Sequence, residues 1–90
     1  MVKYVVKFSK QAEKDKKLLK GAGLEKVTKE LLDIISSDPY QTPPYYEKLK
    51  GNSNEFFSRR INIKHRLVYK VVSETNEVIV LRMWSHYEKI

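Results

Sequence analysis

The sequence predicts a small α+β domain in which an N-terminal strand and a helical hairpin precede a mainly antiparallel sheet. The first seven residues are rich in β-branched and aromatic side chains, residues 9–36 carry two helical patterns, and residues 55–86 contain three strand-like segments. Ninety residues, 26 of them Val, Ile, Leu or Phe, suffice for one hydrophobic core and leave little room for a second. Because no internal repeat or linker divides the chain, we expect residues 1–90 to form a single domain.

The first strand is expected from Val2 to Lys7, where neither glycine nor proline interrupts the chain. Ser9 is a suitable N-cap for a helix that runs to about Lys20, and Gly21 provides its stop. The apolar side of this helix is narrow, and lysines occupy much of the rest. Those lysines form either a solvated face or a contact surface for nucleic-acid phosphates.

A second helix is expected from Leu24 to about Ser36, because apolar residues recur there every three or four positions. The join at residues 21–23 is short, so the two helices should form an antiparallel hairpin. The prolines between Asp38 and Pro44 cannot continue a helix, and this stretch is expected to be a loop. The apolar stripe of the second helix consists of Leu24, Val27, Leu31, Ile34 and Ile35.

The charge of the chain suggests a polyanionic partner. The formal net charge is +7 and the pI is about 9.6, which is typical of proteins that meet nucleic acid. The chain has no cysteine, so disulfides and thiolate metal sites are excluded. No apolar run approaches the length of a membrane span, and the N-terminus lacks the pattern of a secretory signal. A cytoplasmic protein without a membrane contact is therefore expected.

All four arginines fall between residues 59 and 82, in the three expected strands Glu55–Asn62, His65–Val72 and Glu77–His86. The planar guanidinium fits a phosphate in two-point contact, so this clustering favours an anion site. Alternate residues of a strand point to opposite faces of the sheet. The helices should cover the face that carries the apolar sets Phe57 and Ile61 with Arg59, then Leu67, Tyr69 and Val71, then Ile79, Leu81 and Met83.

The opposite face would then carry Arg60, Arg66, Arg82 and His86. An odd-length loop at residues 62–64 places Arg60 directly across from Arg66, at a separation of roughly 5 Å. Like charges directly opposite each other are unfavourable unless an anion lies between them. The pattern therefore predicts a bound phosphate on this face, and the alternative is a solvated polar face without a ligand.

A histidine, a carboxylate and an arginine pair are sufficient to cut RNA without a metal ion. The 2′-hydroxyl attacks the adjacent phosphorus, a base takes its proton, an acid protonates the departing 5′ oxygen, and cations stabilise the phosphoryl charge. His86 is the candidate histidine, because His65 has the apolar parity beside a turn and is expected to pack or cap. The best carboxylate is Glu47, which strand parity does not place. With two histidines and no metal-ligand spacing, neither a metal nor another cofactor is expected.

Three segments resemble the YoeB/Txe toxins of the RelE superfamily. They are Phe57–Asn62 (FSRRIN), His65–Tyr69 (HRLVY) and the pair His86-Tyr87. The segment Glu47–Lys50 (EKLK) is similar to the Glu-x-Leu-Lys stretch of that family. The resemblance implies a RelE-like fold and the toxin of a type II toxin–antitoxin system. Such a toxin is a ribosome-dependent endoribonuclease that cuts mRNA in the A site and is neutralised by a YefM-like antitoxin.

Carried over by position, the resemblance assigns a role to each candidate site residue. Glu47 would be the general base and His86 the general acid, while Arg66 and Arg60 would stabilise the phosphate, Lys50 would assist and Tyr87 would orient the substrate. Two departures from the family pattern are Ile63-Lys64, where acidic residues are usual, and the tail Glu88–Ile90 after His86-Tyr87.

Two other functions fit parts of the pattern. A non-catalytic RNA- or ribosome-binding module would need the basic face but neither Glu47 nor His86. A ParE-like, gyrase-directed toxin on the same fold would need neither the arginine pair nor the terminal His-Tyr. The sequence leaves open whether the chain forms a homodimer.

Overall fold

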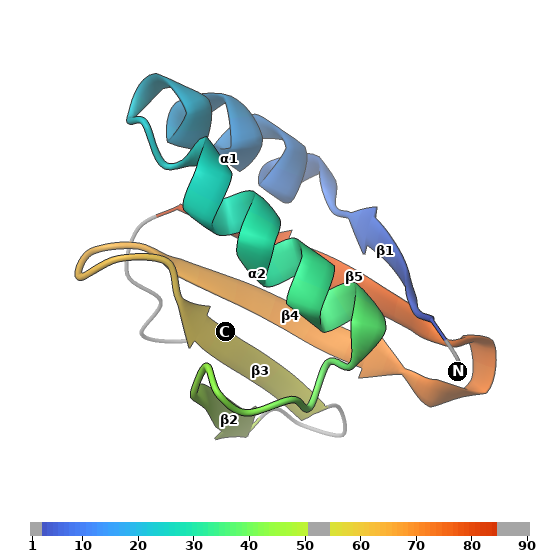
Figure 1. The fold of residues 1–90 in the computed structure, drawn as a ribbon. Helices are drawn as coiled ribbons and strands as arrows, with labels where there is room; N and C mark the ends of the chain where they lie inside the picture. Colours follow the sequence, from blue (N-terminus) through green and yellow to red (C-terminus); the bar gives the residue numbers. More distant parts are fainter. Residues whose placement is uncertain (1–2, 51–54, 85–90) are drawn as a thin grey trace.

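The computed structural model describes residues 3–50 and 55–84, which form two helices and a five-stranded sheet (Figure 1). A single 3₁₀ turn at Ser73–Thr75 joins the last two strands. In chain order the elements are β1 (Val5–Phe8), α1 (Lys10–Gly21), α2 (Glu25–Ser37), β2 (Tyr46–Lys50), β3 (Glu55–Arg60), β4 (Arg66–Val72) and β5 (Glu77–Arg82).

The strands lie in the order β1-β5-β4-β3-β2, and only the β1–β5 pair is parallel. Both helices pack on one face of the sheet, with β1 and β2 at its two edges (Figure 1). The predicted α+β, mainly antiparallel architecture is confirmed. The sequence did not predict β2, which adds a strand beside β3 and carries Glu47.

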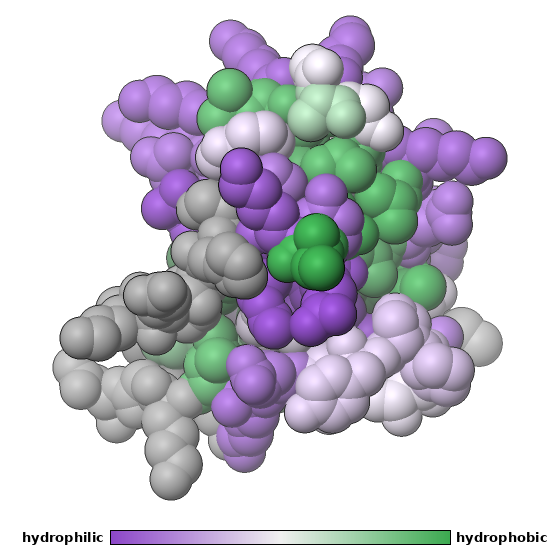
Figure 2. Space-filling view, turned by 90° about the vertical axis from the view of Figure 1, so that its left-hand side faces the viewer, coloured by the Kyte–Doolittle hydropathy of each residue, from purple (hydrophilic) through white to green (hydrophobic). Residues whose placement is uncertain are grey.

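The hydrophobic core lies between the helices and the sheet. In α2, Leu31 and Ile35 are buried as predicted, whereas Val27 is 37% exposed and does not belong to the buried stripe. Hydrophilic groups cover much of the surface in Figure 2, with hydrophobic areas between them. Neither helix in the described part of the chain has the length and apolarity to cross a membrane. The core residues are Ala12, Leu19, Leu31, Ile35, Phe57, Ile61, Leu67, Tyr69, Val78, Val80 and Met83.

Helix α1 begins as predicted, at the N-cap Ser9. The Ser9 hydroxyl accepts a hydrogen bond from the backbone N–H of Ala12 at 3.0 Å and donates to the carbonyl of Leu81 at 2.9 Å. One side chain therefore caps the helix and ties it to the end of β5. At the other end, Gly23 has a φ of 76°, a left-handed conformation that favours glycine and turns the chain into α2.

Replacing Ser9 with alanine should lower the free energy of unfolding by about 1–2 kcal/mol, because the cap is lost and the Leu81 carbonyl loses its donor. Chemical denaturation followed by circular dichroism measures this change. Ser36→Ala is the matched control, since among the described residues the Ser36 hydroxyl bonds only to the carbonyl of Asp33, in an exposed contact. An equal loss in both variants would contradict the cap at Ser9.

The predicted parity of β5 is wrong over its first half. Val78 and Val80 are fully buried, whereas Ile79 and Leu81 are only partly buried. The cause is a β-bulge: Tyr69 pairs with Val80 but Val68 pairs with Arg82, so Leu81 is an extra residue. The bulge reverses the parity, and Met83 is again buried in the core as predicted.

Candidate active site

Polar side chains of three adjacent strands gather on the sheet face opposite the helices. Glu47 of β2 pairs with Ser58 of β3, and Arg60 of β3 pairs with Arg66 of β4. Ser58 in turn pairs with Val68, and both are only 1% exposed. The group therefore has a buried floor beneath three charged side chains.

Arg66 connects the charged side chains of this group. Its Nη1 lies 3.8 Å from Oε1 of Glu47 and donates a long hydrogen bond of 3.4 Å to the Ser58 hydroxyl. The Arg66 side chain is 25% exposed and that of Glu47 is 51% exposed. A guanidinium has five N–H donors, so two long contacts leave donors for an incoming anion. The structure thus places a carboxylate and a partly open guanidinium side by side.

Arg60 lies directly opposite Arg66, which confirms the predicted register. It is exposed, and within residues 3–50 and 55–84 no carboxylate lies at ion-pair distance from it. Two guanidiniums across a strand pair repel each other unless an anion lies between them. The pair is therefore suited to a phosphate group.

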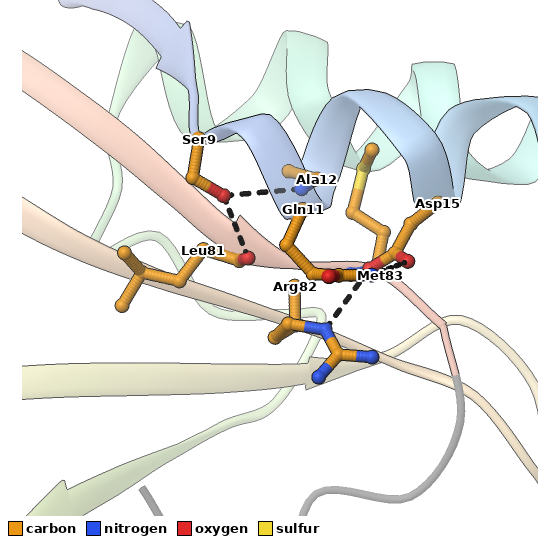
Figure 3. Close-up of polar contacts among 7 residues, drawn as sticks. All are labelled: Ser9, Gln11, Ala12, Asp15, Leu81, Arg82 and Met83. Atoms are coloured by element: carbon orange, nitrogen blue, oxygen red, sulfur yellow. Dashed lines mark hydrogen bonds and ion pairs between the residues drawn. The ribbon is translucent and has the colours of Figure 1, made fainter.

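Arg82, which was predicted to lie on the same face as this pair, instead makes an ion pair with helix α1. Its backbone lies opposite Val68 on the expected face, but its Nε lies 3.2 Å from Oδ2 of Asp15 in α1 (Figure 3). Asp15 is fully buried and also accepts a hydrogen bond from the backbone N–H of Met83. The partner of Arg82 comes from a helix distant in the sequence, and strand parity carries no information about it.

Arg59, next to the site, is fully buried and has a structural role that the sequence analysis missed. Its guanidinium donates to the carbonyls of Pro39, Gln41 and Pro44 at 2.8–3.0 Å and to the Tyr69 hydroxyl at 3.1 Å. These contacts fix the loop that leads directly into β2 and Glu47. One feature of the sequence indicated that Arg59 is buried: it has the same strand parity as the apolar residues Phe57 and Ile61.

The Tyr69 hydroxyl completes this buried network by donating to the Pro39 carbonyl at 2.7 Å. Burial raises the pKa of Tyr69, and the hydrogen bond and positive charge of Arg59 offset part of that effect. The phenol therefore keeps the proton that it donates. Both side chains therefore bind the loop that leads into β2.

The structure tests the predicted role of only one of the two histidines, because His65 is among the described residues and His86 is not. His65 is 5% exposed, and its ring stacks on Trp84 with centroids 3.9 Å apart, which confirms the expected packing role. His86 and Tyr87 lie outside the described residues, as does the side chain of Lys50, whose backbone belongs to β2. Their proposed roles remain predictions.

The unusual pair Ile63-Lys64 lies in the turn between β3 and β4. Ile63 is 85% exposed, and the Asn62 side chain accepts hydrogen bonds from the N–H groups of Lys64 and His65 at 2.8 and 2.7 Å. Asn62 therefore closes the turn, and the site pair Arg60–Arg66 flanks it directly. Within the described part of the chain, no group of three His, Cys, Asp or Glu could hold a metal ion.

Comparisons with known proteins identify the family. The model of the YoeB-like toxin of bacterial type II toxin-antitoxin systems matches residues 6–87. The Toxin YoeB of Synechocystis sp. (strain ATCC 27184 / PCC 6803 / Kazusa) is 35% identical over 77 residues, which cover 86% of this chain and 80% of the relative.

Solved structures agree with this match. The YoeB dimer of Staphylococcus aureus superposes with a TM-score of 0.79 at 34% identity, and the YoeB-YefM complex of the same organism gives 0.76 at 34%. Each comparison covers 96% of this chain and 100% of the other. The matched region contains every strand of the site described above. The chain belongs to the YoeB-like toxin family of bacterial type II toxin–antitoxin systems.

Proposed function

We propose that this toxin is a ribosome-dependent endoribonuclease that cuts mRNA in the ribosomal A site without a metal ion. The observation that carries the proposal is the contact between Glu47 and Arg66, with Arg60 directly across the strand pair. This arrangement offers a proton acceptor next to two cations that suit a phosphate. Membership of a toxin family with nuclease activity supports the same reading.

Glu47 takes the proton from the 2′-hydroxyl of the ribose, and the resulting oxygen attacks the adjacent phosphorus. The bond from phosphorus to the 5′ oxygen breaks, which leaves a 2′,3′-cyclic phosphate on one product. Arg66 and Arg60 stabilise the negative charge that grows on the phosphoryl oxygens. The distance of 3.8 Å between Oε1 of Glu47 and Nη1 of Arg66 suits these two roles. The base contacts the 2′-hydroxyl and the guanidinium contacts the phosphate, and these groups are neighbours in one dinucleotide step.

The remaining roles rest on the family resemblance. His86 gives a proton to the departing 5′ oxygen, Tyr87 orients the substrate, and Lys50 adds positive charge near the phosphate. His86 suits the acid role because the imidazole has a reference pKa of about 6.5.

The partners follow from the same family. Because the Staphylococcus aureus relatives form a YoeB dimer and a YoeB-YefM complex, we infer a homodimer and a YefM-like antitoxin for this chain. The basic face around Arg60 and Arg66 suits an acidic antitoxin segment that folds as it binds. Ribosomes and mRNA are the proposed targets, and the cytoplasm is where the toxin meets them.

The test is primer extension on an mRNA bound to 70S ribosomes, with and without the toxin. Cuts at a codon in the A site that require ribosomes are expected. The same mRNA carrying a single 2′-deoxynucleotide at the mapped cut position should resist cleavage there, because the attacking hydroxyl is absent. Cleavage of free mRNA, or of the deoxy-substituted mRNA, would contradict the mechanism. Ribosome binding without any cut would make the chain a binding module.

Replacing His86 with glutamine should slow cleavage about 10²-fold, because the 5′ oxygen then leaves without an acid. Single-turnover cleavage on saturating ribosomes measures the rate. Sedimentation with ribosomes provides the control, since the variant should still bind them. A folded variant that cuts at the wild-type rate would remove His86 from the mechanism.

A further inference from the structure

Aromatic side chains surround the candidate site, and most of them pack within the protein. Tyr46 lies edge-on to Phe57 of the core, with ring centroids 5.4 Å apart. Tyr40 contacts the same Phe57 ring at 5.6 Å, and Trp84 stacks on His65 at 3.9 Å. These rings therefore contribute to the fold.

Tyr45 differs from these aromatic residues, because its side chain is exposed. It is 77% exposed and belongs neither to the core nor to the residues packed against it. Within residues 3–50 and 55–84, its ring takes part in none of the aromatic or cation–π contacts. The ring of Tyr45 is therefore accessible to a ligand.

The strand register places Tyr45 beside the arginine pair of the candidate site. In the antiparallel β2–β3 pair, Tyr46 lies opposite Arg59. The residue before Tyr46 is therefore nearest to the residue after Arg59, which is Arg60. Arg60 in turn pairs with Arg66 of β4. Tyr45, Arg60 and Arg66 thus follow one another across three strands, with about 5 Å between neighbours.

Strand alternation places Tyr45 on the same face of the sheet as the proposed base. The Tyr46 ring contacts Phe57 on the core side, whereas Glu47 contacts Arg66 on the opposite side. Tyr45 and Glu47 flank Tyr46 in the sequence, so they share a face, and their Cα atoms are about 7 Å apart. The high exposure of Tyr45 agrees with this orientation.

A nucleotide carries a flat base and a phosphate on one ribose. Proteins hold single-stranded RNA by stacking aromatic side chains on its bases and by binding its phosphates with cations. We propose that Tyr45 is a substrate-binding residue, which stacks on one of the two RNA bases that flank the phosphate bound by Arg60 and Arg66. The inference rests on the proposed function and adds to it a contact with a base.

Substitutions of Tyr45 separate stacking from other contributions of the side chain. Tyr45→Phe and Tyr45→Trp keep an aromatic face, Tyr45→Leu keeps only apolar bulk, and Tyr45→Ala removes both. Tyr40→Ala is the matched control, because Tyr40 is a tyrosine of the same loop that is 41% exposed but contacts Phe57.

Single-turnover cleavage on saturating ribosomes measures the effect of each substitution, and circular dichroism confirms that each variant is folded. Tyr45→Ala should lower the rate about tenfold, within the range that one stacked base contributes. Tyr45→Leu should be similarly slow, whereas Tyr45→Phe, Tyr45→Trp and a folded Tyr40→Ala should match the wild type. A folded Tyr45→Ala that cuts at the wild-type rate would overturn the proposal. If that variant also dimerised more weakly in analytical ultracentrifugation, the ring would instead be a contact between two copies of the chain.

An mRNA that lacks one base tests the other partner of the stack. The base is removed from each flanking nucleotide in turn, and the ribose with its 2′-hydroxyl is kept. At one of the two positions the wild type should slow about tenfold, and Tyr45→Ala should lose no further rate, because ring and base act as a pair. Independent losses in rate at both positions would contradict stacking by Tyr45.

Photocross-linking separates this proposal from the proposed function, because it requires no cut. An mRNA with 5-iodouridine in the A-site codon is irradiated on ribosomes with the toxin, and tandem mass spectrometry locates the cross-linked residue. A cross-link at Tyr45 is expected. If the wild type formed this cross-link but cut no mRNA, the endonuclease would be refuted and the stacking retained. If the wild type cut mRNA but formed no cross-link at Tyr45, and Tyr45→Ala cut equally fast, the stacking would be refuted and the endonuclease retained.

Discussion

Replacing Arg66 with alanine is expected to slow cleavage on the ribosome about 10³-fold, the upper end of what one charge-stabilising donor contributes. The proposed mechanism gives Arg66 two roles, which explains the size of the effect. Its guanidinium would oppose the charge on the phosphoryl oxygens, and it lies 3.8 Å from the carboxylate of Glu47, the proposed base. Alanine leaves the growing charge unopposed and removes the cation beside the base.

Single-turnover cleavage on saturating ribosomes measures this effect, with two variants for comparison. Arg66→Lys should recover only part of the rate, because an ammonium cannot reproduce the two-point fork. Lys70→Ala is the matched control: Lys70 is another cation with the same parity on β4, about 13 Å farther along the strand. Equal losses in Arg66→Ala and Lys70→Ala would show that the site requires positive charge alone.

Replacing Arg59 with methionine is expected to lower the free energy of unfolding by about 3–5 kcal/mol. Methionine keeps the apolar stem, but the carbonyls of Pro39, Gln41 and Pro44 lose their buried donor. The Tyr69 hydroxyl loses its contact as well. Small domains are stable by only about 5–15 kcal/mol, so this change removes much of the total.

Urea denaturation followed by circular dichroism measures the loss. Arg60→Met is a strict control, because Arg60 is the next residue of the same strand, is exposed and points to the other face. It should change the free energy of unfolding by less than about 0.5 kcal/mol while impairing cleavage. The two neighbouring arginines would then have separate roles: Arg59 would stabilise the fold, and Arg60 would contribute to cleavage. Similar destabilisation by both would contradict the buried role of Arg59.

Local patterns predicted much of the fold and the register of Arg60 against Arg66. Ser9 caps α1 as expected, and the helices end within one residue of their predicted bounds. The register of Arg60 against Arg66 followed from counting residues in the turn, because a hairpin fixes which residues are opposite. These features depend on residues that are close together in the sequence, so they can be predicted from one sequence alone.

Features that depend on distant contacts were missed. Strand β2 (YEKLK) is short and mostly charged, and it forms because its backbone pairs with β3. The bulge at Leu81 reverses the parity of β5, and no residue type there marks it. Asp15 and Arg59 find backbone partners 15 to 68 residues away in the sequence. Their roles therefore emerge only when the chain is folded.

The parallel pairing of β1 with β5 sets the order in which the toxin is completed during its own synthesis. Val5 pairs with Glu77, so β1, which is synthesised first, has no strand to pair with until β5 has been synthesised. β5 also separates β1 from the rest of the sheet, and a nascent chain that ends before it cannot close the core. Contacts so distant in the sequence form late and slowly. The toxin therefore cannot complete its fold until most of the chain has been synthesised.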